Sequence, residues 1–103
     1  MKYETITQIL KESKIPFAYY QFKDPPKSEK YIAYFETEKV QFYADNTVYD
    51  WAPSFAVELY TKTKDLEAEK ILIDLFCKYE VPWSGGASNW IDTEKMLQTV
   101  FYC

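Results

Sequence analysis

Residues 55–79 have the sequence FAVELYTKTKDLEAEKILIDLFCKY, which holds the two clearest secondary-structure signals in the chain. In residues 55–61, apolar side chains alternate with a second set, and one face carries Phe55, Val57 and Leu59. Because successive side chains of a strand point to opposite faces, this alternation predicts a strand with one face in the core.

A helix is predicted directly after this strand, from about Asp65 to Tyr79. Asp65 is a suitable N-cap, and Glu67 and Glu69 place negative charge at the positive end of the helix dipole. The apolar positions recur at helical spacing and form one stripe. The stripe consists of Ala68, Leu72, Leu75, Phe76 and Tyr79, with Ile71 at its margin.

The residues before this unit predict a short helix followed by several strands. Ile6, Ile9 and Leu10 have helical spacing, and Pro16 ends the helix because the residue before a proline avoids helical angles. Asp45-Asn46 is a turn signal. Pro53 interrupts the strand expected after this turn, and a bulge or an edge position would accommodate it. Strands are expected at 17–22, 31–36 with a continuation at 40–43 after a charged break, and 48–51.

After the second helix, Val81-Pro82 marks its end and Ser84-Gly85-Gly86 is predicted to be the one flexible stretch. Residues 88–92 and 96–102 then predict a closing hairpin. The order of elements indicates an α+β fold, with a mostly antiparallel or mixed sheet of about five to six strands and two helices packed on one face. We expect a single domain over residues 1–103.

The charge distribution disfavours nucleic acid and membrane partners. The net charge is −4, the chain contains no His, and all its basic residues are Lys. A net negative protein repels phosphate backbones and anionic lipid heads, and Arg is the preferred residue for reading bases. No signal peptide or membrane-length apolar run is present, so we expect no membrane partner.

Residue types that support catalysis or metal binding do not form a recognisable pattern. Without His, a Ser or Cys nucleophile lacks its usual base. Cys77 is expected to be a small buried hydrophobe and Cys103 a free thiol. Carboxylates flank a turn or share a helix end, where solvation or capping explains them. We therefore expect no catalytic residue, no metal and no cofactor.

Aromatic residues make up 19% of the chain and are the feature that most favours protein contacts. Tyr and Trp supply large rigid contact area together with one polar atom. Trp51, Trp83 and Trp90 fall beside expected loops and strand ends, where a tryptophan either seals the edge of the core or contacts a partner. Both interpretations stay open at this stage.

Four segments, in this order, resemble the tail-terminator (tail completion) proteins of long-tailed phages of low-GC Gram-positive bacteria. None of them is a catalytic signature, and their combined order carries the resemblance. The segments are Ile15-Pro16-Phe17-Ala18-Tyr19-Tyr20 after the first helix, Ala44-Asp45-Asn46-Thr47-Val48-Tyr49, Glu58-Leu59-Tyr60-Thr61-Lys62-Thr63-Lys64-Asp65, and Trp90-Ile91-Asp92-Thr93-Glu94-Lys95.

The resemblance implies a non-enzymatic virion protein, assembled in the host cytoplasm. Such a protein forms a ring, expected to be a hexamer, that caps the tail tube and joins it to the head. Its partners would be further copies of itself, the tail-tube protein and the head–tail connector, and DNA would pass through the ring without specific binding. The candidate interface residues are Asp45, Tyr49, Trp51, Trp83 and Trp90.

Two alternatives remain open from the sequence. A neighbouring head–tail connector or head completion protein would share these properties and differ only in its position in the particle. A small acidic phage-encoded inhibitor of a host enzyme would also lack catalytic residues, and it would gather its carboxylates on one face.

Overall fold

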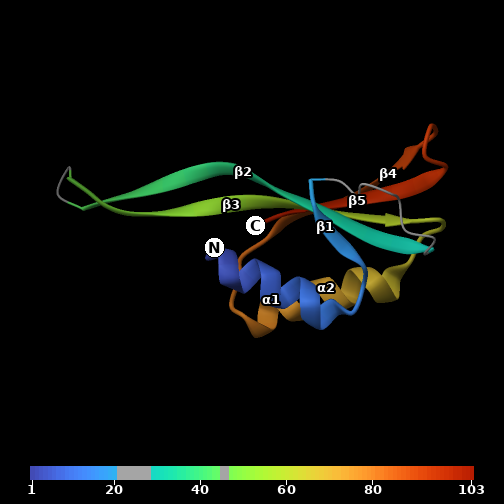
Figure 1. The fold of residues 1–103 in the computed structure, drawn as a ribbon, viewed down its shortest axis with the longest axis horizontal. Helices are drawn as coiled ribbons and strands as arrows, with labels where there is room; N and C mark the ends of the chain where they lie inside the picture. The colour runs from blue at the N-terminus through green and yellow to red at the C-terminus, as the bar shows by residue number, and fades with distance from the viewer. Residues whose placement is uncertain (21–28, 45–46) are drawn as a thin grey trace.

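The computed structural model describes residues 1–20, 29–44 and 47–103 of the chain. A mixed sheet forms one layer and two helices form the other (Figure 1). The elements in chain order are α1 (Tyr3–Ser13), β1 (Phe17–Tyr19), β2 (Lys30–Ala44), β3 (Thr47–Thr61), α2 (Leu66–Lys78), β4 (Ser84–Ile91) and β5 (Met96–Tyr102).

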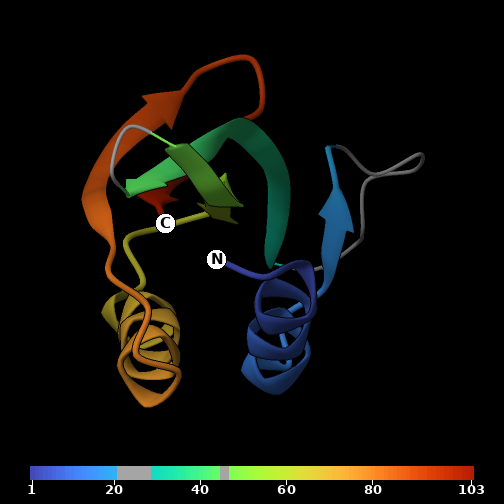
Figure 2. The ribbon, with the colours of Figure 1, turned by 90° about the vertical axis from the view of Figure 1, so that its left-hand side faces the viewer.

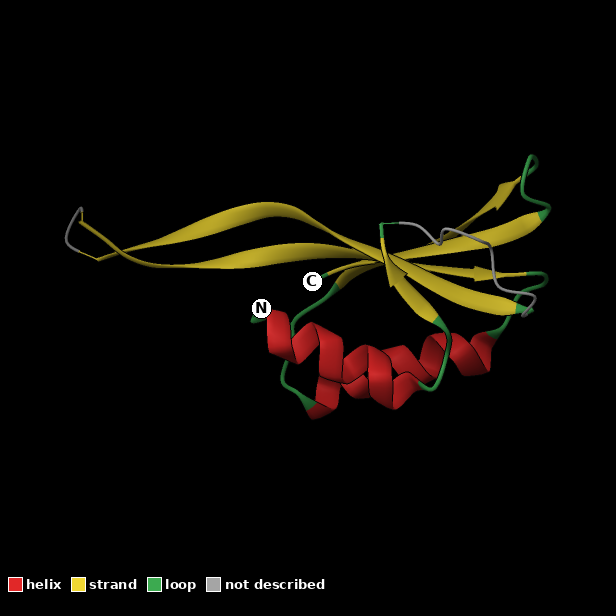
Figure 3. Ribbon diagram, in the orientation of Figure 1, coloured by secondary structure: helices red, strands yellow, loops and turns green. Residues whose placement is uncertain are grey.

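The five described strands have the order β1-β2-β3-β5-β4. β1 runs parallel to β2, and all other neighbouring pairs are antiparallel. Both helices cover the same face of the sheet (Figure 3), and a view along the long axis shows them side by side beneath it (Figure 2). The predicted α+β class, the mixed sheet and the one-sided helices are confirmed. The opposite face of the sheet, which no described helix covers, is called the open face below.

The core lies between the helices and the central strands. Phe55, Val57 and Leu59 are all buried in it, which confirms the alternation predicted for β3. The other buried core residues are Ile6, Ile9, Leu10 and Ile15 near α1, Ala68, Leu72 and Phe76 on α2, Ile32 on β2 and Phe101 on β5.

Both helices begin or end with residues that satisfy their free backbone groups. The Asp65 carboxylate accepts a hydrogen bond from the Ala68 amide at 3.0 Å, which confirms the predicted N-cap of α2. α1 ends at Ser13, three residues before Pro16, and Lys14 follows in a left-handed conformation at φ 60°. The Ser13 hydroxyl there donates to the Leu10 carbonyl at 2.6 Å and accepts from the Ile15 amide.

One cluster of polar side chains links the ends of the two helices. The Lys78 ammonium lies 2.6 Å from the Glu12 carboxylate of α1, and the Tyr79 hydroxyl donates to the same carboxylate. These hydrogen bonds, from Lys78 first and then from Tyr79, lower the pKa of Glu12 to about 2. The cluster therefore fixes α1 against α2 while Glu12 is ionised.

The prediction of flexibility at Ser84-Gly85-Gly86 is wrong, because these residues begin β4. The two glycines have φ of 89° and 87°, and a shift in register separates Gly85 from Ser88. A Cβ atom on Gly85 would lie 2.6 Å from the Val100 carbonyl oxygen. Glycine is therefore needed for a close approach of two backbones at a bulge.

The burial predicted for Cys77 is also wrong, since its side chain is exposed. Phe76, the residue before it, faces the core, and one residue further along a helix turns the side chain by about 100°. The stripe of Ala68, Leu72 and Phe76 therefore leaves Cys77 outside.

Three strand boundaries differ from expectation. The charged break in β2 is a bulge between Glu36 and Glu38 within one continuous strand. Pro53 does not interrupt β3, and it lies opposite Lys39 of β2. β5 does not extend as far as Pro53, so β3 is an edge strand here and the expected edge position is confirmed. β1 ends at Tyr19, and the remainder of the strand predicted at 17–22 lies mostly outside the described residues.

Candidate protein-interaction surface

The hairpin of β2 and β3 extends well beyond the rest of the sheet. β5 pairs with β3 only as far as Ala56, and β1 pairs with β2 only as far as Tyr34. Residues 38–44 and 47–54 therefore form a two-stranded projection, called the hairpin arm below, which gives the molecule principal extents of 49 × 26 × 22 Å (Figure 1).

The hairpin arm exposes large apolar side chains on both of its faces. Val40 and Phe42, which are 38% and 44% exposed, lie on the side that continues the open face. Trp51, which is 48% exposed, lies on the opposite side, in line with buried Phe55. A two-stranded hairpin is marginally stable in water, and exposed apolar groups on it mark a surface suited to a partner.

Aromatic and charged contacts hold the root of the arm against α1. The Tyr3 ring packs edge-on against both Trp51 and Phe55, with centroids 6.5 and 5.8 Å apart. The Tyr3 hydroxyl donates to the Glu36 carboxylate at 2.9 Å, and this hydrogen bond lowers the pKa of Glu36. Lys39 lies 3.1 Å from the same carboxylate and 6.0 Å from the centre of the Trp51 ring. The root of the arm thus has a defined orientation.

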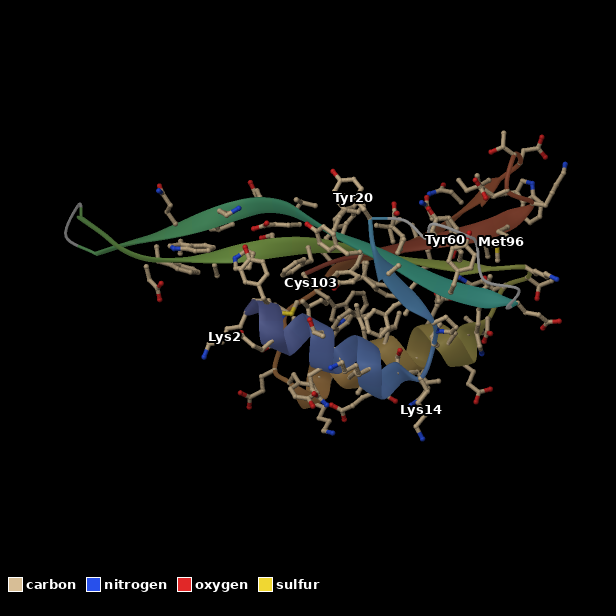
Figure 4. The ribbon with its side chains drawn as sticks, viewed as in Figure 1. Lys2, Lys14, Tyr20, Tyr60, Met96 and Cys103 are labelled. Atoms are coloured by element: carbon tan, nitrogen blue, oxygen red, sulfur yellow. The ribbon has the colours of Figure 1, made fainter. Side chains whose placement is uncertain are left out.

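The open face of the sheet carries stacked aromatic rings. Tyr31 and Tyr60 stack with centroids 5.0 Å apart, and Tyr20 stacks on Phe35 at 5.4 Å. Figure 4 shows Tyr20 and Tyr60 on the side of the sheet away from the helices. Tyr20 is 66% exposed and has a left-handed backbone conformation, with φ of 71°.

The Glu58 carboxylate on the open face is partly desolvated. The Glu58 carboxylate accepts hydrogen bonds from Tyr60 at 3.3 Å and from Gln98 at 3.0 Å, and Gln98 also donates to the Tyr60 hydroxyl at 2.9 Å. Burial raises the pKa of Glu58, and the Tyr60 hydrogen bond only partly offsets this effect. Burial therefore destabilises the ionised form of Glu58 relative to a carboxylate in water.

The five residues predicted for a protein interface do not form one cluster. Trp51 lies on the hairpin arm in β3, the middle strand of the order, whereas Trp83 precedes the edge strand β4 and Trp90 lies within it. Tyr49 belongs to β3, but its side chain lies outside the described residues, as does Asp45 altogether.

The two tryptophans near β4 differ in their surroundings. Trp83 packs edge-on against buried Phe101, with centroids 5.5 Å apart, so it covers the edge of the core. This is one of the two roles that the sequence left open for it. Trp90 is 53% exposed, and its indole nitrogen donates to Asp92 at 3.4 Å. Of the two, Trp90 offers the freer surface for a contact.

Val40 and Phe42 were not among the residues predicted to lie at a protein interface. Both were placed within an expected strand, and their spacing of two puts them on one face. The sequence could not reveal that this face lies beyond the rest of the sheet, because that depends on where β1 and β5 end.

A groove of about 510 Å³ lies where the N-terminal residues, the end of α2 and Cys103 meet. Burial raises the pKa of the Cys103 thiol to about 12, which keeps it protonated and a weak nucleophile at neutral pH. Among residues 1–20, 29–44 and 47–103, no group of three His, Cys, Asp or Glu side chains is placed to hold a metal ion.

No described helix is long and apolar enough to cross a membrane. No protein-family model matches the chain, and no curated protein matches it either. The function is therefore inferred from the residues and their arrangement.

Proposed function

We propose that this chain is a non-enzymatic structural subunit of a long-tailed phage, the tail terminator, which forms a ring that caps the tail tube and joins it to the head. The hairpin arm is the observation that carries this proposal. It projects from the sheet with Val40, Phe42 and Trp51 exposed, and an exposed apolar projection is suited to contact a neighbouring subunit or the tube.

The order of the four sequence segments that resemble tail terminators supports the same proposal. The third segment, residues 58–65, forms the end of β3 and the N-cap of α2, and the fourth, residues 90–95, forms the end of β4 and the turn that leads to β5. These segments thus define the framework from which the hairpin arm projects.

The surface charge fits a ring through which DNA slides. The chain has a net charge of −4 and no Arg. Six Lys–carboxylate pairs distribute the two signs of charge over the described surface. A mimic of DNA would instead need its carboxylates unpaired and gathered, so this pairing disfavours the inhibitor alternative.

The test is the mass and shape of the purified protein over a range of concentrations, with and without its cognate tail-tube protein. Light scattering gives the mass, and negative-stain microscopy shows the particles. We expect rings, or tubes capped at a fixed length. A protein that stays a monomer at high concentration and leaves tube growth unchanged would contradict the proposal.

A further inference from the structure

The charged residues of the five described strands are divided unevenly between the two faces of the sheet. The register of β2 and β3 places three carboxylates and no lysine on the open face and its continuation along the hairpin arm: Glu38, Asp50 and Glu58. The two strand lysines, Lys30 and Lys39, lie on the side of the helices, and each is paired with a carboxylate. β1, β4 and β5 contain no charged residue. The strand residues of the open face therefore carry negative charge alone.

Glu58 is the most sheltered of these carboxylates. Glu38 and Asp50 are exposed, whereas Glu58 is partly buried. Its hydrogen-bond donors, Tyr60 and Gln98, are both neutral. Within residues 1–20, 29–44 and 47–103, no lysine forms an ion pair with it. A cation supplied from outside the chain would stabilise the ionised form that burial disfavours.

Stacked aromatic rings lie directly beside Glu58. Tyr60, which donates to Glu58, stacks on Tyr31 with an angle of 18° between the ring planes. Burial, and to a lesser extent the charge of Glu94 in the turn before β5, raises the pKa of Tyr31. The ring pair is therefore close to two carboxylates. Because cations are attracted both to aromatic faces and to carboxylates, this arrangement suits a cationic side chain.

We propose that the open face binds a basic segment of a different protein, with an arginine side chain seated against the Glu58 carboxylate and the Tyr60 ring. A planar guanidinium can pair with a carboxylate through two hydrogen bonds and also stack on an aromatic ring. This chain contains no Arg, so a second copy does not supply the group. Val40 and Phe42, exposed on the same side of the sheet, offer apolar contacts to the rest of the segment.

The spacing of the carboxylates distinguishes this surface from a mimic of DNA. Counted along β3, they occur at the levels of residues 58, 54 and 50, because Glu38 lies opposite Ser54. At about 3.3 Å per residue, neighbouring levels are about 13 Å apart. Duplex DNA carries one charge for about every 1.7 Å of its axis. The face therefore matches a segment with few, separated basic residues, and the inference does not depend on the ring proposed above.

The test uses a peptide probe with the sequence Arg-Thr-Val-Thr-Arg-Thr-Val-Thr-Arg and blocked ends. In extended form it places its arginines on one side, about 13 Å apart. A control peptide has citrulline, which is similar in shape but uncharged, in place of each arginine. Binding to the isotope-labelled full chain is followed by NMR titration, which also shows whether the signals of Tyr60 and Gln98 move.

Two matched variants separate a contact at Glu58 from general attraction. Glu58→Gln keeps the shape of the side chain and removes its charge. Glu67→Gln makes the same change in net charge on an exposed residue of α2, on the other side of the sheet. We expect Glu58→Gln to bind the arginine peptide about tenfold more weakly than the unmodified protein. Glu67→Gln should change the affinity less than about twofold, and the citrulline peptide should not distinguish the two variants.

The ring is tested by Tyr60→Leu, which should weaken binding about threefold through loss of the aromatic face. Circular dichroism checks that each variant is folded, and should Tyr60→Leu fail to fold, the Glu58 and Glu67 variants decide the question alone.

Three results would overturn the proposal. The arginine peptide could fail to bind at about 1 mM. The Glu58 and Glu67 variants could bind it equally well. The unmodified protein alone could self-associate in a way that Glu58→Gln abolishes, which would make a second copy the occupant of this face. The terminator role is tested with the tail-tube protein and without the peptide, so either proposal can fail while the other stands.

Discussion

Shortening the hairpin arm should leave the fold intact. In the proposed variant, Asn-Gly replaces residues 41–51, so that Val40 and Ala52 flank a two-residue turn. Their backbone groups face each other in the register, which is the geometry that such a turn requires. Every residue of the hydrophobic core cluster remains.

The expected loss of stability follows from the contacts removed. The edge-on contact of Trp51 with Tyr3 is worth about 0.5–1.5 kcal/mol, and the Lys39 contact with the Trp51 ring about 0.5 kcal/mol. A bare two-stranded hairpin adds little. The variant should therefore lose about 1–2 kcal/mol, whereas Phe76→Ala in the core should lose about 3–5 kcal/mol.

Urea unfolding followed by circular dichroism measures both variants, with the m-value as a check that the folded core is unchanged. The arm-shortened protein should show a modest fall in midpoint and no self-association. A loss as large as that of Phe76→Ala would show that the arm belongs to the cooperative core. Normal rings from the folded variant would show that the arm is not the interface.

Three further predictions concern single ionisable residues. The lowered pKa of Glu12 means that its contribution is full above pH 4.5 and is lost as the pH falls to about 2, so the Tm difference between wild type and Glu12→Gln should vanish over that window. The raised pKa of Glu58 has the opposite sign: ionisation destabilises the fold, and Glu58→Gln should gain stability relative to wild type as the pH rises above 4.5. Asp65→Ala should lose about 1 kcal/mol in chemical unfolding through the cap of α2, and Asp65→Asn should recover most of it; equal losses would contradict the capping role.

Local sequence patterns predicted the parts of the fold that depend on neighbouring residues. The alternation at Phe55, Val57 and Leu59 and the cap at Asp65 each involve contacts within a few positions, and the structure confirms both. The parallel pairing of β1 with β2 could not be predicted in this way, because it depends on a connection through residues whose pattern indicates only a loop.

The glycines near β4 show why a local signal can mislead. Gly85 and Gly86 lack the side chains that stabilise a strand, so the pattern favoured a flexible stretch. The need for glycine at position 85 depends on the Val100 carbonyl, which is distant in sequence and close in space. For the candidate surface, the composition indicated that some aromatic residues contact a partner. Which of them lie on the hairpin arm depends on where the pairing of β1 and β5 with their neighbours stops, and the structure is needed to show this.

The separation of the three tryptophans gives the protein built-in spectroscopic reporters. Trp51 samples the hairpin arm, Trp90 the edge of β4 and Trp83 the border of the core beside Phe101. Trp51 and Trp90 are about half exposed, so water relaxes around their excited indoles. In variants that keep one tryptophan, assembly should shift the emission of Trp51 or Trp90 to shorter wavelength and leave that of Trp83 nearly unchanged. The proposed assembly can thus be followed by fluorescence without any attached dye.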